Sequence, residues 1–168
     1  LIAYNTDSKI AKTVRSNGVL LAQVTPRGGI ISGQSSVMHL DGWNWEDAVL
    51  RVDDGMHLNW PSTFHQGGWW EEAGKTKENK KYNKHITELR NFFKEASSYA
   101  NSSSLIDLRM ESMKGLFNGN KTLYIHADNA KDMLDAIDFA NNFEIPKIVI
   151  VGAKDALKII DELKENNI

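Results

Sequence analysis

The sequence has 168 residues, 41% hydrophobic and 25% charged, which is the composition of one ordinary globular domain. Twenty basic and 22 acidic residues give a formal net charge of −2, which argues against the concentrated positive field of nucleic-acid-binding proteins. The absence of cysteine excludes disulfides and a cysteine nucleophile, and no apolar run approaches the roughly 20 residues of a membrane span.

The first residues predict a helix followed by a strand. Residues 8–16 carry Ile10 and Val14 one turn apart, with capping side chains ahead of them and Gly18 behind. Residues 19–24, VLLAQV, form a nearly continuous apolar run, which is typical of a strand covered on both faces.

The middle of the chain has weaker patterns. Residues 30–40 mix strand formers with glycine and serine, and predict an irregular ribbon or loop. Residues 45–52 have helix character, and residues 56–58 could form a short strand. Residues 62–81 are rich in glycine and lysine without a sustained period, so we expect a flexible insertion there.

The second half alternates between helices and strands. Apolar periodicity predicts helices over residues 85–99, 106–117, 130–141 and 154–164, and strands over residues 122–126 and 147–151. A β-α-β-α order implies parallel strands joined by right-handed crossovers. We therefore predict one α/β unit over residues 1–168, whose parallel sheet contains residues 19–24, 122–125 and 147–151 with helices outside it.

His126 is the leading candidate for a functional residue. It closes the apolar strand that begins at Thr122, and ligands bind at the carboxyl ends of parallel strands in barrels and open sheets alike. The alternative is a hydrogen-bonded histidine without a catalytic role, beside a helix that Asp128 or Asn129 caps.

A glycine-rich segment is the second candidate. Its glycines let backbone N–H groups approach a ligand, and an arginine is available for a carboxylate. The candidate substrate-binding residues are Arg27, Gly28, Gly29, Ser32 and Gln34. The segment fits neither GxGxxG nor the P-loop pattern, and glycine pairs more often make tight turns.

The other histidines give no recognisable site. His39, His57 and His65 show no HxH or HExxH pattern and no carboxylate at ligand spacing, so we predict surface or packing roles for them. No GxSxG nucleophile motif is present.

Two strings resemble metal-dependent amidohydrolases of the imidazolonepropionase-like and prolidase-like groups. They are NTDSKIAKTVRSNGVLLAQVTPRGGIISGQSSVMHLDGWNWEDA (residues 5–48) and KTLYIHADNAKDMLDAIDFANNF (residues 121–143). The part PRGGIISGQSSVMHLDGW is similar to exported bacterial members, which implies an exported or periplasmic location.

The resemblance implies a (β/α)8 TIM barrel in which histidines, often a carboxylated lysine, and an aspartate hold one or two divalent metals, with zinc favoured. His126 would match the histidine that ends the fifth barrel strand. The HxH pair would lie before Leu1 and the aspartate beyond Ile168, and Val151 stands where many relatives have a histidine on the sixth strand.

We therefore expect an internal piece of a hydrolase that cleaves C–N bonds of small amides or dipeptides. The piece alone would be inactive and hold no metal, and it would settle as an open three-layer sandwich or pair with another copy through exposed sheet edges. The alternative is a non-enzymatic α/β module that binds a small ligand or partner through the glycine-rich segment and Trp69-Trp70.

Overall fold

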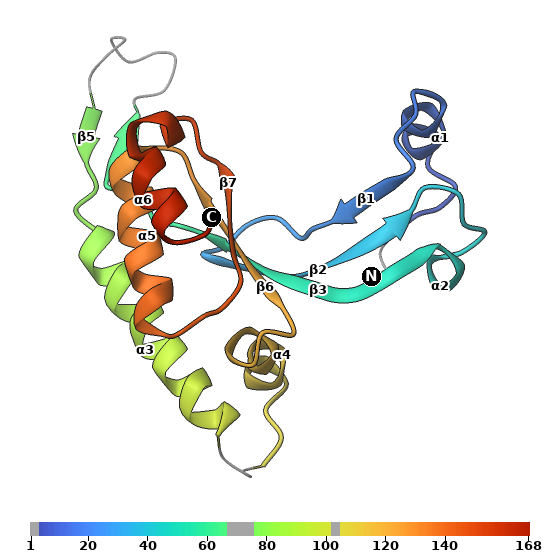
Figure 1. The fold of residues 1–168 in the computed structure, drawn as a ribbon. Helices are drawn as coiled ribbons and strands as arrows, with labels where there is room; N and C mark the ends of the chain where they lie inside the picture. The colour runs from blue at the N-terminus through green and yellow to red at the C-terminus, as the bar shows by residue number, and fades with distance from the viewer. Residues whose placement is uncertain (1–3, 67–75, 102–104) are drawn as a thin grey trace.

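The computed structural model describes residues 4–66, 76–101 and 105–168 (Figure 1). The elements in chain order are α1 (Lys9–Ser16), β1 (Leu21–Val24), β2 (Ile31–His39), α2 (Trp45–Ala48), β3 (Val49–Asn59), β4 (Phe64–Gln66), β5 (Thr76–Glu78), α3 (Tyr82–Ala100), α4 (Leu108–Phe117), β6 (Thr122–Ala127), α5 (Ala130–Asn142), β7 (Ile148–Gly152), the 3-10 helix η1 (Ala156–Ile159) and α6 (Ile160–Glu165).

Five strands form one mixed sheet in the order β1-β2-β3-β6-β7. The first three strands pair antiparallel, whereas β3, β6 and β7 run parallel. In the parallel part, His126 lies opposite Asn59 on one side and opposite Val151 on the other. Strands β4 and β5 form a separate antiparallel pair.

The core lies between the parallel strands and the helices. Leu123 and Ile125 of β6 are fully buried, and they belong to one cluster with Leu58 of β3 and with Phe93 and Phe139 of the helices. Burying a side chain of this size contributes about 1.5–3 kcal/mol, so this face dominates the stability of the fold. The alternate residues of β6 point to the opposite face, and the described helices that line the core cover one face of the parallel strands only.

This arrangement has two layers in the described part of the chain, not the three that an open sandwich would have. Beyond the helices, the antiparallel strands β1 to β3 extend as an arm (Figure 1). The α/β class and the flanking helices are confirmed, but the sheet is mixed, not wholly parallel.

The prediction for residues 19–24 was wrong in two respects. The strand β1 starts at Leu21 and lies antiparallel at an edge of the sheet, where it pairs with β2. The predicted run 19–24 is not covered on both faces: Leu20, just before β1, is 66% exposed, and Leu21, its first residue, is 44% exposed. An apolar run identifies a strand, but the neighbours that cover it are set by the tertiary fold.

The predictions for the middle of the chain have mixed outcomes. Of the ribbon or loop predicted over residues 30–40, the irregular ribbon is confirmed: β2 pairs antiparallel with β3, with register shifts at Gly33 and near Val37. The helix predicted over residues 45–52 ends at Ala48, and β3 begins at the next residue. The strand expected at residues 56–58 is the last part of β3.

The remaining elements agree with the sequence patterns. The helices predicted over residues 8–16, 85–99, 106–117 and 130–141 correspond to α1, α3, α4 and α5, and the two later strands correspond to β6 and β7. The helix predicted over residues 154–164 is a 3-10 turn followed by α6. Within residues 62–81, short strands β4 and β5 form; Trp69 and Trp70 lie outside the described residues.

Candidate functional site

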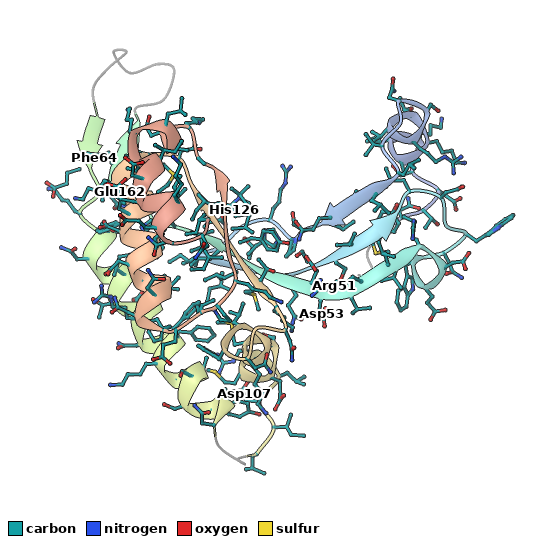
Figure 2. All side chains as sticks on the ribbon, in the orientation of Figure 1. Arg51, Asp53, Phe64, Asp107, His126 and Glu162 are labelled. Atoms are coloured by element: carbon teal, nitrogen blue, oxygen red, sulfur yellow. The ribbon has the colours of Figure 1, made fainter. Side chains whose placement is uncertain are left out.

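His126 is the penultimate residue of β6, the middle strand of the parallel part. Because side chains alternate along a strand, its ring lies on the face opposite the core (Figure 2). It lines a hollow of about 360 Å³ at the carboxyl ends of the parallel strands. The other lining residues are Trp60, Ser62, Ala127, Asp128, Asn129, Asp132, Val151 and Gly152.

A second histidine contacts His126. His57 of β3 places its Nδ1 atom 2.9 Å from Nε2 of His126, and the two ring planes are tilted by 41°. The sequence patterns missed this pair, because 69 residues separate the two histidines and only the pairing of β3 with β6 joins them. The available signal was the position of His57 within an apolar strand, between Met56 and Leu58.

The ring of His57 is held in place by its neighbours. It stacks on Tyr124, with the ring centroids 4.7 Å apart and the planes within 7° of parallel. The Tyr124 hydroxyl donates to Asp54 at 2.9 Å, and Asp54 also accepts from Gln23 at 3.0 Å and pairs with Arg51 at 3.0 Å. This network restricts the ring to one orientation beside His126.

The side chain of His57 is 3% exposed, and its buried Nε2 atom has no hydrogen-bond partner among the described residues. Burial lowers the pKa of His57 below its usual value, the neighbouring His126 lowers it further, and Asp54 partly offsets both effects. His57 is therefore a neutral imidazole at neutral pH. Along the contact with His126 one ring donates and the other accepts, depending on the tautomers.

The two imidazoles fit a divalent metal such as zinc in chemical type, because neutral imidazole nitrogen is one of its preferred ligands. The fit is partial. A zinc site takes three or four protein ligands, and the described residues contain no group of three or more His, Cys, Asp or Glu side chains that could hold an ion. Val151, opposite His126 on β7, offers no donor.

The predicted substrate-binding residues are divided between the two faces of the sheet. The Asn59 side chain donates to the Gly29 carbonyl at 2.7 Å and to Ser32 Oγ at 2.9 Å. Because Asn59 lies opposite His126 in the register, these two residues belong to the His126 side. Gln34 instead donates to the Ser112 carbonyl of α4 at 3.3 Å, which places it on the helix-covered face.

The rest of the glycine-rich segment is exposed. Arg27 is exposed, and Gly28 and Gly29 adopt φ values of +97° and +70°, a conformation that favours glycine. The chain bends at this glycine pair, and its role in substrate binding stays a prediction. Of the other histidines, His39 is exposed at the end of β2, and His65 lies on β4.

The segment after His126 caps the next helix. The Asn129 side chain accepts from the Asp132 N–H at 2.8 Å, which is an N-cap hydrogen bond for α5. Asp128 pairs with Lys154 at 2.7 Å. Asp132 is buried and accepts from the N–H and hydroxyl groups of Thr63 at 3.2 and 3.0 Å, which fixes the chain after β3 at the rim of the hollow.

No protein-family model and no curated protein matches the sequence. Among solved structures, the fold is similar to that of an amidohydrolase from Thermotoga maritima MSB8, with a TM-score of 0.77 and 19% sequence identity. The match covers 98% of this chain and 45% of the other, so the chain spans less than half of its neighbour. The likeness establishes a shared fold.

None of the helices within the described residues has the length and apolar character needed to span a bilayer.

Proposed function

We propose that this chain is part of the catalytic domain of a metal-dependent amidohydrolase, and that His126 contributes to the metal site. One observation carries the proposal: His126 is the penultimate residue of the middle parallel strand and lies on the uncovered face, near the strand ends where ligands bind, in a fold shared with an amidohydrolase. Its substrates would be small amides or dipeptides, and an exported or periplasmic location belongs to the same proposal.

The residues of this chain would position ligands and substrate around a metal that other segments complete. A bound divalent metal, zinc in the first instance, would polarise the amide carbonyl and make water a nucleophile at neutral pH. His126 would supply one neutral nitrogen ligand. Arg27, Gly28, Gly29 and Ser32 are the candidates to line the substrate side, where Asn59 tethers the glycine-rich turn. Substrate binding by Gln34 stays a prediction.

The test is a comparison of variants in the protein that contains this chain. Bound metal is measured by inductively coupled plasma mass spectrometry. Hydrolysis is screened with N-acyl amino acids, dipeptides and cyclic amides. We expect His126→Ala to reduce bound metal and hydrolysis together, with the fold intact because a rim side chain leaves no core cavity. His39→Ala is the matched control, because it removes an exposed histidine on another strand.

Two results would refute the proposal. One is unchanged metal content and turnover in His126→Ala, which would return His126 to the role of a strand-end histidine. The other is tight binding of a small ligand without metal and without hydrolysis, which would favour the non-enzymatic binding module.

A further inference from the structure

A second hollow adjoins the one that His126 lines. It has a volume of about 580 Å³ and lies where the turn after β6 meets the turn after β7. The two hollows have three lining residues in common, so together they form one continuous concave surface that includes His126. The shared residues are Ser62, Asp128 and Asn129.

The second hollow carries more positive than negative charge. Its lining contains three lysines and two carboxylates, which leaves a net charge of +1; these residues are Lys131, Lys154, Lys158, Asp128 and Asp155. Asp128 pairs with Lys154 at 2.7 Å. Asp155 pairs with Lys158 at 2.8 Å. The hydrogen bond from Lys158 lowers the pKa of Asp155, and the hydrogen bond to Asp128 raises the pKa of Lys154. Both carboxylates therefore already have a partner within the hollow.

Among the described residues, Lys131 is the lysine of this lining that has no acidic partner. Its side chain is exposed, and it also borders a smaller hollow with Glu78 without forming an ion pair there. An unpaired ammonium group on a concave surface attracts anions, because the low-dielectric walls concentrate its field. The charge that the lining leaves unbalanced matches one carboxylate of a ligand.

The backbone joins the two turns that form the walls of this hollow. The Ala153 N–H donates to the Ala127 carbonyl at 2.9 Å, and the Asp155 N–H donates to the Asp128 carbonyl at 2.9 Å. Ala153 adopts a φ of +52°, a conformation that residues other than glycine rarely adopt. Such strain persists only where surrounding contacts impose it, and it is common at ligand-binding sites. The two hydrogen bonds thereby hold Lys154 and Asp155 on the wall of the hollow.

We propose that this hollow binds a carboxylate of the substrate and that Lys131 is the residue that selects for it. The inference rests on the proposed function and narrows its substrates to amides that carry a negative charge close to the scissile bond. N-acyl amino acids and dipeptides with a free carboxyl terminus have this chemistry. The amide lies in the hollow at His126, and the carboxylate lies in the hollow at Lys131. Lys154 and Lys158 contribute less, because carboxylates of this chain already hold their ammonium groups.

The first test compares the binding of N-acetylglycine with that of its neutral analogue N-acetylglycinamide by isothermal titration calorimetry. It uses the protein that contains this chain, treated with a chelator so that metal-dependent hydrolysis is suppressed. We expect the protein to bind N-acetylglycine more tightly than the neutral analogue. Lys131→Gln should weaken the binding of N-acetylglycine by roughly fivefold, the effect of one exposed ion pair, and should leave binding of the analogue unchanged.

Two variants serve as controls, and circular dichroism checks that every variant is folded. Lys131→Arg keeps the positive charge and should retain the preference for N-acetylglycine. Lys12→Gln removes an exposed lysine of α1, which lies on the arm away from the helices of the core (Figure 1), and should leave binding unchanged.

The second test is kinetic and uses the metal-loaded protein. Lys131→Gln should raise KM for N-acetylglycine and leave kcat within about twofold, because a contact remote from the scissile bond is made equally in the ground state and the transition state. The kinetic constants for a neutral amide should not change.

Three outcomes would overturn the inference. They are equal affinity of the unmodified protein for the two compounds, unchanged binding of N-acetylglycine by Lys131→Gln, and an equal loss in Lys12→Gln, which would show a general effect of charge. Hydrolysis of amides without any preference for charged ones would leave the proposed function standing while this inference fails. Selective binding of N-acetylglycine through Lys131, in a protein without metal and without hydrolysis, would refute the proposed function and leave the carboxylate site in place.

Discussion

The position of His126 follows from the two-residue period of β6. Leu123, Ile125 and Ala127 face the core, so Tyr124 and His126 must face the other side. The same period on β3 buries Met56 and Leu58 and turns His57 toward His126. The hydrophobic residues therefore determine which polar side chains meet, although they do not contact the site.

Tyr82 gives a prediction at the residue scale. Burial and the hydrogen bond that its hydroxyl donates to Asp135 at 2.8 Å raise its pKa to about 12. In the unfolded chain a tyrosine titrates near pH 10, so the folded chain retains the proton longer. The free energy of unfolding should therefore be insensitive to this group below about pH 10 and should fall as the pH rises from there toward 12.

Tyr82→Phe removes this titration. Ultraviolet absorbance of tyrosinate should lose the contribution of one tyrosine to the late step near pH 12 in the variant, and the alkaline loss of stability in urea unfolding should become shallower. The control is Tyr4→Phe, because the Tyr4 hydroxyl contacts the backbone carbonyl of His39 and not a carboxylate. Tyr124 keeps a late step of its own, because burial and its hydrogen bond to Asp54 raise its pKa as well. An unchanged amplitude of the late step in Tyr82→Phe would therefore contradict the assignment.

At the scale of elements, the close packing of β3 against β6 brings the two histidines together. Gly55 permits it: a Cβ atom there would lie 2.4 Å from Cε2 of Tyr124 and 2.6 Å from the Thr122 carbonyl. The carbonyl belongs to the backbone of the neighbouring strand, so the clash cannot be relieved by a side-chain rotation alone.

Gly55→Ala should therefore destabilise the fold by about 1–3 kcal/mol, as overpacking typically does. Urea unfolding followed by circular dichroism measures the change. Val149→Ala, on the partly exposed edge strand β7, is the control and should change stability by no more than about 0.5 kcal/mol. Equal stability of Gly55→Ala and the unmodified chain would show that the strands have room to move apart.

The elements differ in how far the sequence predicts them, and the reason is physical. The unit from β6 to β7 has local signals: apolar strands, a periodic helix and an N-cap at Asn129. The strands β2 and β3 have none of comparable strength, because Gly33, Gly55 and several serines interrupt the apolar pattern and the pairing contains register shifts. Their stability comes from pairing between strands that are far apart in the sequence, and such pairing cannot be predicted from local sequence patterns.

The residues of the candidate site also differ in whether a local sequence signal predicts them. His126 could be predicted, because a strand end followed by a helix is a local pattern. His57 could not, since its partner lies 69 residues away and motif spacing identifies only ligands on one element. Gln34 shows the reverse case: it is near the glycine-rich turn in sequence but is turned to α4 by the irregular pairing of β2.

At the scale of the whole molecule, the face that carries both histidines is not covered by the described helices of the core, and β1 and β7 are the outer strands of the sheet. The structural neighbour has more than twice the length that the match covers. Ligands that complete a metal site would come from segments that meet this face. A barrel of eight strands and a pairing of copies through the outer strands both stay predictions.

The most direct test of the central claim is anomalous X-ray diffraction at the zinc absorption edge, from crystals of the protein that contains this chain grown with Zn²⁺. We expect a metal peak about 2.0–2.1 Å from a ring nitrogen of His126, on the face opposite the helices. An ordered structure in which His126 contacts no metal, or in which zinc binds only at a distant site, would contradict it.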